Sequence, residues 1–445
     1  MSHVAKAHEQ LAPRARFILA GLLLVVGTPR VVAETPPVDW ADQFGTSSWD
    51  TTIDLAINGS GHIFVTGHTR GSLGGASAGG ADVFISKWNI NGDLLWTSQE
   101  GSTYDELVQG VAADELGNSY IAGLTEDAAH QRDAFVSRYD PNGQRLWTHQ
   151  FGSSPVEDVC FGVAADVSGV YVAGGTGSDL WGGGSLGQND AFLRKYDPNG
   201  RVIWTDQFGS SGGEYADAVT LDGAGNVYVA GTMHIGGINS DAFVRKYDPN
   251  GQVLWARQIG SSDNDWDVSR DLTVDALGNV YLVGTTDGSF GQPSAGGLDV
   301  FLCKYDANGD LKWSVAFGSL GDDGSHAVCT DASGSVYITG YATGDLGDGH
   351  VGQRDVFLAK YDPNGLRVWM SQFGTAEGDE GSGVAIDGLG HIYLSGRTFG
   401  SLFGPQLGDE DAFIASIPEP AALSILALGG LILFQRRRRQ RRLHP

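Results

Sequence analysis

A carboxylate recurs seven times along the chain, each time at the start of a short run of strand-forming residues. Several carboxylate oxygens together are the ligands that Ca²⁺ prefers, and around the mouth of a channel they would form a cation site. No D-x-D-x-D-G loop accompanies them, so such a site would be weak or built between neighbouring units. The alternative is that each carboxylate caps backbone amides where the chain enters a strand. The seven residues are Asp50, Glu106, Asp158, Glu214, Asp267, Asp323 and Asp379.

Aromatic residues lie in or beside the links that carry these carboxylates and, in the case of Trp181, in a long glycine-rich loop. Exposed rings beside carboxylates suit sugars, because the ring stacks on a sugar face while polar groups bond the hydroxyls. The alternative is that the rings fill gaps between repeated units. The candidate ligand-binding residues are Trp49, Tyr104, Trp181, Tyr215 and Trp266.

Catalytic motifs occur only outside the context that gives them meaning. G-x-S-x-G is found at 75–79 and 183–187, in glycine-rich loops rather than in a strand-to-helix turn. No H-E-x-x-H or Walker sequence is present. The three cysteines, Cys160, Cys303 and Cys329, are too widely spaced for a CxxC metal site and are predicted to be free thiols. We assign no catalytic residue; a carbohydrate lyase or hydrolase that uses two carboxylates at the channel mouth is the alternative.

Three markers show that the body of the chain consists of seven copies of one unit. One is an aromatic residue followed three positions later by glycine, from Phe64 and Gly67 to Tyr393 and Gly396. The second is Asp-x-Phe, which begins at Asp82, Asp133, Asp190, Asp241, Asp299, Asp355 and Asp411. The third is tryptophan, at Trp40, Trp96, Trp147, Trp204, Trp255, Trp313 and Trp369.

Each unit contains four strand-like runs. In the fourth unit they are 217–221, 227–231, 241–247 and 253–258. The first two runs are joined by Asp222–Asn226 and the last two by Asp248–Gly251, where glycine and asparagine permit hairpin turns. Four antiparallel strands in each of seven units predict an all-β, seven-bladed β-propeller.

The ends of the repeat region favour a closed ring over an open solenoid, the main alternative. The seventh unit stops at Ile417 without its tryptophan strand, and Val38–Gly45 supplies that copy near the N-terminus. A solenoid has no need to divide one unit between its two ends, whereas a ring closed by an N-terminal strand leaves no exposed edge.

The repeated motifs GN-V-Y-V-x-G, D-A-F-x-x-K-Y-D-P-N-G and L-W-x-x-Q-F-G resemble those of the SBBP-type β-propeller repeat family, from Val38 to Ile417. The resemblance implies the fold and leaves the activity open. The second turns of units one, three, five, six and seven are long and varied, and they share a face of the ring with the links between units. Binding is expected on this long-loop face.

The first 33 residues are predicted to be a secretory signal peptide. Arg14 and Arg16 precede the apolar run Phe17–Gly27, and Val31–Ala33 offers small residues for cleavage before Glu34. The apolar run is too short to cross a bilayer, which argues against an uncleaved anchor.

The C-terminal segment 418–445 is predicted to be a sorting tail. Pro418-Glu419-Pro420 is followed by the short apolar run Ala421–Phe434 and then by six arginines. This order resembles the PEP-CTERM signal of Gram-negative bacteria, which implies cleavage by an exosortase-type enzyme and export linked to exopolysaccharide. Contact with the membrane is expected only through this tail, and only transiently.

The charge of the chain limits its partners. The formal net charge is −25, and both terminal segments are basic, so the body 34–417 is more acidic still. Nucleic acid is therefore not expected as a partner, because phosphate binding needs clustered cations. The sequence favours an exported, non-catalytic module of the cell surface or matrix that binds polysaccharide or a surface protein, with Ca²⁺ as the one cofactor considered.

Overall fold

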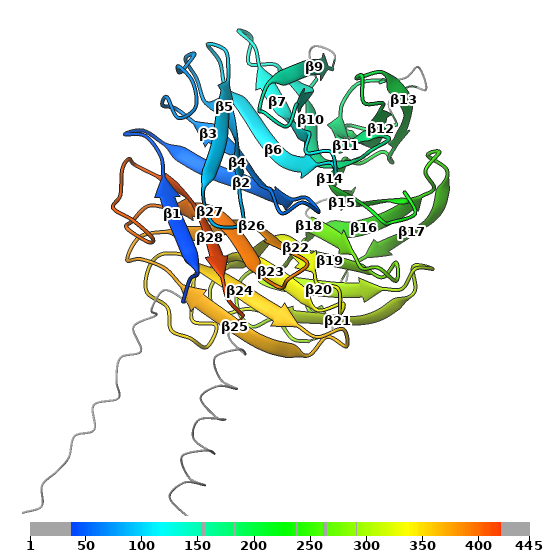
Figure 1. Cartoon of the computed structure of the whole chain (residues 1–445). Coiled ribbons are helices and arrows are strands. Elements are labelled where there is room, and N and C mark those ends of the chain that lie inside the picture. The colour runs from blue at the N-terminus through cyan, green and yellow to red at the C-terminus, as the bar shows by residue number, and fades with distance from the viewer. Residues whose placement is uncertain are drawn as a thin grey trace, which may run out of the picture. The chain divides into compact units, whose positions relative to one another are not determined.

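A computed structural model of the chain describes residues 37–419 apart from 153–155, 181–183, 185, 237–238, 261–264 and 291. The described residues form seven four-stranded antiparallel sheets, each of which is one blade (Figure 1). In six of the blades the strands follow one another in chain order from the first, inner strand to the fourth, outer strand, and in the seventh the outer strand comes from the N-terminal end of the described chain. This confirms the all-β, seven-bladed propeller that the repeats predict.

The strands are assigned to the blades as follows. Blade 1 consists of β2 (Asp50–Ile57), β3 (Ile63–Thr69), β4 (Asp82–Trp88) and β5 (Leu94–Glu100), and blade 2 of β6 (Glu106–Ala113), β7 (Ser119–Glu126), β8 (Arg132–Tyr139) and β9 (Arg145–Phe151). Blade 3 consists of β10 (Asp158–Asp166), β11 (Gly169–Thr176), β12 (Asp190–Tyr196) and β13 (Val202–Phe208), and blade 4 of β14 (Glu214–Leu221), β15 (Val227–Gly236), β16 (Asn239–Tyr247) and β17 (Val253–Ile259). Blade 5 consists of β18 (Asp267–Val274), β19 (Val280–Thr286), β20 (Asp299–Tyr305) and β21 (Leu311–Phe317), and blade 6 of β22 (Asp323–Thr330), β23 (Val336–Ala342), β24 (Asp355–Tyr361) and β25 (Arg367–Phe373). Blade 7 consists of β26 (Asp379–Ile386), β27 (Ile392–Thr398), β28 (Asp411–Ile417) and β1 (Trp40–Phe44).

The N-terminal strand closes the ring. β1 pairs antiparallel with β28, from Trp40 opposite Ser416 to Phe44 opposite Ala412. The inner strand β26 of blade 7 also packs against β2 of blade 1, so the succession of inner strands has no free end. The first and last strands of the described body therefore belong to one blade, as expected for a ring and not for a solenoid.

The hydrophobic core lies between neighbouring blades. One cluster combines Tyr228 and Val244 of blade 4 with Leu272, Leu282 and Phe301 of blade 5. Five of the outer-strand tryptophans strengthen such a junction by a hydrogen bond to the next blade; for example, Trp255 Nε1 donates to the carbonyl of Ala307 at 3.1 Å. These contacts explain why tryptophan and the tight turn recur together in the sequence.

The tight third turns need glycine. In blade 4, Asp248 Oδ1 accepts hydrogen bonds from the backbone amides of Asn250 (2.9 Å) and Gln252 (2.8 Å). Gly251 then adopts a φ of 85°, and a Cβ there would lie 2.9 Å from the ring of Trp204 in blade 3. Any other residue at this position would therefore have an unfavourable backbone conformation, and its Cβ would also clash with the tryptophan ring.

Candidate ligand-binding site

The seven recurring carboxylates are the first residues of the seven inner strands, where the chain arrives from the links on the long-loop face. All seven are buried, with exposed fractions of 9% or less, and each belongs to a different blade. We refer to them as the inner-strand carboxylates.

Hydrogen bonds tie several inner-strand carboxylates to the link that precedes them. Asp50 accepts from the backbone amide (2.6 Å) and the Oγ1 (2.8 Å) of Thr46, four residues earlier. Asp379 accepts from the same two groups of Thr375. Among the described residues no three His, Cys, Asp or Glu side chains come close enough to hold one metal ion. The capping role thus has contacts that support it, and calcium binding stays a prediction.

The predicted aromatic residues are spread around the ring. Trp49 stacks on His68 with ring centroids 6.0 Å apart, and its Nε1 donates to Glu410. Tyr104 lies in the link between blades 1 and 2 with 38% exposure, and Trp266 lies in the link before blade 5. Trp181 falls outside the described residues. The structure therefore does not gather these rings into one surface, and each must be judged by its own surroundings.

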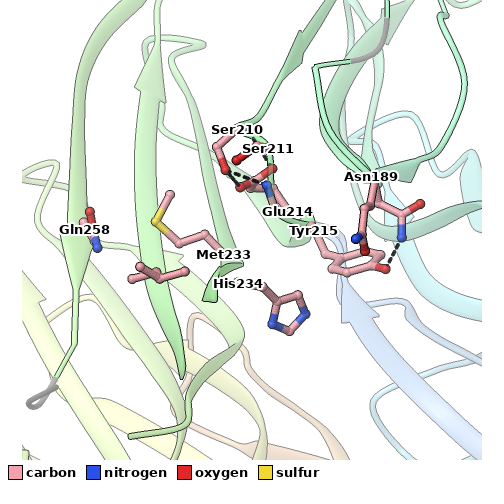
Figure 2. Close-up of a pocket in the computed structure, with 12 residues that line it drawn as sticks. Asn189, Ser210, Ser211, Glu214, Tyr215, Met233, His234 and Gln258 are labelled. Atoms are coloured by element: carbon pink, nitrogen blue, oxygen red, sulfur yellow. Dashed lines mark hydrogen bonds between the residues drawn. The ribbon is translucent and has the colours of Figure 1, made fainter. Parts of the chain in front are cut away.

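Tyr215, the remaining predicted aromatic, lines a cavity of about 760 Å³ above blade 4 (Figure 2). We call this cavity the blade-4 hollow. It forms where a second turn is short: β15 ends at Gly236 and β16 begins at Asn239, whereas the second loops of blades 3 and 5 extend over 177–189 and 287–298. The hollow therefore opens on the long-loop face, where binding is expected.

An aromatic corner lies at one side of the hollow. The rings of Tyr215 and His234 meet edge to face, with centroids 6.1 Å apart and an interplanar angle of 79°. The Tyr215 hydroxyl accepts a hydrogen bond from Asn189 Nδ2, and His234 Nδ1 lies 2.7 Å from Ser240 Oγ. These contacts fix both rings, so the corner is formed before any ligand arrives.

Both polar and apolar side chains line the rest of the hollow. Figure 2 shows Ser210, Ser211, Met233 and Gln258 along its walls. Glu214 is the one carboxylate among the described lining residues, and it accepts from the amide of Ser210 at 2.9 Å. The serine hydroxyls and the amides of Asn189 and Gln258 can exchange hydrogen bonds with hydroxyl groups, so the hollow is suited to holding a ligand that carries them.

Several of these residues escape prediction from the sequence. Asn189, Met233 and His234 belong to no repeated motif, and Gln258 is the glutamine of the repeated L-W-x-x-Q-F-G motif, which does not set unit four apart from the others. The signal that could have found them is the contrast between the short second turn of unit four and the long ones of its neighbours.

Most of the predicted terminal segments lie outside the described residues. The signal peptide 1–33 and residues 420–445 of the sorting tail belong there, and so do the proposed cleavage positions near Glu34 and Pro420. Glu419 of the Pro-Glu-Pro sequence is described, and it accepts hydrogen bonds from Lys360 Nζ (2.6 Å) and from the Tyr337 hydroxyl. Within the described part of the chain, no helix has the length and apolar character needed to cross a membrane.

Two segments of the chain, 254–291 and 368–404, match the family model of the SBBP β-propeller repeat. The regulatory protein FlaEY of Caulobacter vibrioides is 31% identical over 166 residues, which are 34% of this chain and 17% of that protein. An uncharacterized WD repeat-containing protein of Acanthamoeba polyphaga mimivirus is 18% identical, with 84% of this chain and 37% of that protein covered. The chain thus spans less than two thirds of the length of either curated relative.

Solved structures with a similar fold include a protein of unknown function from Dyadobacter fermentans, with a TM-score of 0.47, 12% identity and coverage of 86% of this chain and 99% of that one. Another is Drosophila plexin A in complex with semaphorin 1b, with a TM-score of 0.47, 9% identity and coverage of 87% and 88%. Two segments of the ring therefore match the SBBP repeat, and the seven blades give the described body the β-propeller fold.

Proposed function

We propose that this chain is an exported, non-catalytic binding module of the bacterial cell surface or exopolysaccharide matrix, and that it binds a polysaccharide strand in the blade-4 hollow. The observation that supports this function is the fixed corner of Tyr215 and His234 beside amide and hydroxyl side chains. Ring faces contact the C–H face of a sugar, and the polar side chains exchange hydrogen bonds with its hydroxyls.

Export is the second part of the proposal and is supported by the sequence of the two ends. The signal peptide directs the chain out of the cytoplasm, and an exosortase-type enzyme removes the tail after Pro-Glu-Pro. The intact mass of protein collected from the cell surface reports where the chain ends. A mature protein that ends near Pro420 agrees with the proposal, and one that retains the six arginines contradicts it.

A binding experiment tests the site. The mature protein is applied to an array of neutral bacterial polysaccharides, and the tightest ligand is then titrated against variants. Tyr215→Ala is expected to weaken binding about tenfold, which corresponds to ~1.4 kcal/mol. Tyr104→Ala removes the same side chain from a link outside the hollow and serves as the matched control.

A second variant separates binding from folding, because the Tyr215 ring also packs near Phe161. Ile235 lines the hollow and is 50% exposed, so Ile235→Lys is expected to block the hollow without a loss of core packing. If both Tyr215→Ala and Ile235→Lys bind as the wild type does, the ligand is not in the blade-4 hollow.

A further inference from the structure

Every inner strand carries a β-bulge at the same place. The pairing of the first and second strands skips one residue in each blade, for example between Thr52 and Asp54 in blade 1. A β-bulge leaves one residue of the strand unpaired and changes the direction in which its side chain points. The seven skipped residues all line the cavities of the central channel: Ile53, Gln109, Phe161, Asp217, Arg270, His326 and Ser382.

These seven equivalent positions carry seven different residue types. By contrast, the first position of each inner strand is always a carboxylate, and the position two residues after the bulge is always leucine or valine. A position that served only to fill a symmetric ring would carry similar side chains in each blade. The internal symmetry is therefore broken at the channel, where side chains from all seven blades meet.

Two arginines, Arg270 and Arg397, and two carboxylates, Asp217 and Glu380, line a cavity of about 330 Å³ at the channel mouth. Arg397 Nη2 lies 2.6 Å from Glu380 Oε2, and Arg354 also pairs with Glu380, so two guanidinium groups share this carboxylate. Arg270 is exposed to the channel and forms no ion pair with the described residues. The carboxylate at the neighbouring bulge, Asp217, accepts instead from Ser269 Oγ (2.6 Å) and Thr232 Oγ1 (2.7 Å).

The other lining groups of the mouth suit a sugar. Ile53, Gln109 and Phe161 follow one another around the ring and offer an apolar surface, an amide and an aromatic ring. His326 donates from Nδ1 to the carbonyl of Gly381 (3.0 Å), which leaves Nε2 to accept a hydrogen bond from a hydroxyl group. A volume of about 330 Å³ lies near the lower end of the ~300–1,000 Å³ that small-molecule pockets occupy.

We propose that the channel mouth binds the carboxylate group of an acidic sugar, a uronate, with Arg270 as its main partner. The guanidinium fork matches a carboxylate in two parallel hydrogen bonds, and Arg270 has no ion pair with the described residues that a ligand would have to displace. Phe161 contacts the sugar ring, and Gln109, Ser382 and His326 bond its hydroxyls. The uronate site shares no lining residue with the blade-4 hollow, although Phe161 of the one contacts Tyr215 of the other. Substitutions at Arg270, which does not line the hollow, therefore test the uronate site separately from polysaccharide binding in the hollow.

The test is a titration of the mature protein with sodium glucuronate, followed by calorimetry. Glucose is the neutral probe, and acetate and inorganic phosphate are the anions without a sugar ring. We expect glucuronate to bind at least tenfold more tightly than glucose, acetate or phosphate. Arg270→Gln is expected to reduce glucuronate binding at least tenfold, and Arg270→Lys to restore part of it because the charge returns without the fork.

Arg201→Gln is the matched control, because it removes the same charge from an exposed third turn outside the channel. It is expected to bind glucuronate as the wild type does. Arg270 has no ion pair with the described residues, so the melting temperature of Arg270→Gln should stay close to that of the wild type. If Arg270→Gln does not fold, glucuronate binding by Arg270→Lys tests the proposal instead. Glucuronate binding that is absent, that phosphate matches, or that neither Arg270 variant weakens overturns the proposal.

Discussion

At the scale of single residues, two aspartates of the channel wall link neighbouring blades. Asp271 follows the bulge of blade 5 and accepts from the amide of Val328 in blade 6 at 2.8 Å. Asp54 follows the bulge of blade 1 and accepts from the amide of Val111 in blade 2 at 2.9 Å. Burial raises the pKa of Asp54 to about 6 and that of Asp271 to about 8, and the Asp54 charge adds to the rise at Asp271.

A raised carboxyl pKa makes stability depend on pH. The folded ring holds the Asp271 proton more tightly than the unfolded chain, whose aspartates titrate near 3.8. Stability is therefore expected to fall as the pH rises from about 4 to about 8, and the full loss is reached above that range. Asp271→Asn removes the titrating group, so its melting temperature should change less between about pH 5 and pH 9 than that of the wild type. Parallel melting profiles for the two proteins would contradict the raised pKa.

At the scale of strands and turns, the repeats predicted most of the fold. Alternating glycine-rich turns and aromatic runs placed all four strands of blade 4, and the copy of the tryptophan strand at Val38–Gly45 predicted the closure by β1. The strand ends were less accurate: β14 begins at Glu214 rather than 217, and β15 extends to Gly236 rather than 231. A bulge lengthens β14, and the pairing up to a short second turn lengthens β15. Neither feature can be recognised from the strand propensities of the residues in a single unit.

The candidate sites were harder to predict than the strands. The recurring carboxylates attract attention because they are repeated, and in blades 1, 4 and 7 they accept hydrogen bonds from backbone amides of the preceding link. The channel residues differ from blade to blade, so a search for shared motifs passes over them. An alignment of the seven units that looks for one variable position between constant ones would have found Arg270 and its equivalents.

The closing strand gives a prediction at this scale. Gln43 of β1 donates to Asp411 (2.8 Å) and to the carbonyl of Gly400 (2.9 Å), and its Oε1 accepts from the amides of the loop 402–404. Gln43→Ala should therefore destabilise the ring by roughly 2 kcal/mol or more, at ~0.5–1.5 kcal/mol for each hydrogen bond.

The matched control is Gln150→Ala in the equivalent outer strand of blade 2, where the side chain donates to Asp133 at 2.9 Å and the second turn is short. Thermal melting should show a larger loss for Gln43→Ala than for Gln150→Ala. Deletion of Val38–Gly45 should be the most damaging change of the three, since it also exposes the edge of β28. Equal melting temperatures for all these proteins would contradict the role of β1 as the closing strand.

At the scale of the whole molecule, acidic side chains face each other at the junctions between blades. Gly209, between blades 3 and 4, shows how close they come: a Cβ there would lie 2.6 Å from Asp190 Oδ1 and 2.7 Å from Glu214 Oε2. The first belongs to the Asp-x-Phe series and the second to the inner-strand carboxylates, and Gly152 and Gly374 at two other junctions also lie close to one residue of each series. A chain with a net charge of −25 thus buries like charges in pairs, which requires either strong hydrogen bonding or a bound cation.

The hydrogen bonds favour capping, and this gives the last prediction. Asp323 accepts from the amide and the Oγ of Ser319 and from the amide of Thr343, so its oxygens already have partners without a metal ion. We therefore expect Ca²⁺ to shift the melting temperature no more than NaCl at the same ionic strength. Asp323→Asn should lower the melting temperature by a few degrees with or without Ca²⁺, because charge-assisted bonds worth about 1.5–3 kcal/mol are weakened.

Scanning fluorimetry of the wild type and of Asp323→Asn in CaCl₂, MgCl₂ and NaCl distinguishes capping from calcium binding. A rise that is specific to Ca²⁺ and absent from Asp323→Asn would show that only the folded ring assembles a calcium site, and would replace capping as the function of these carboxylates.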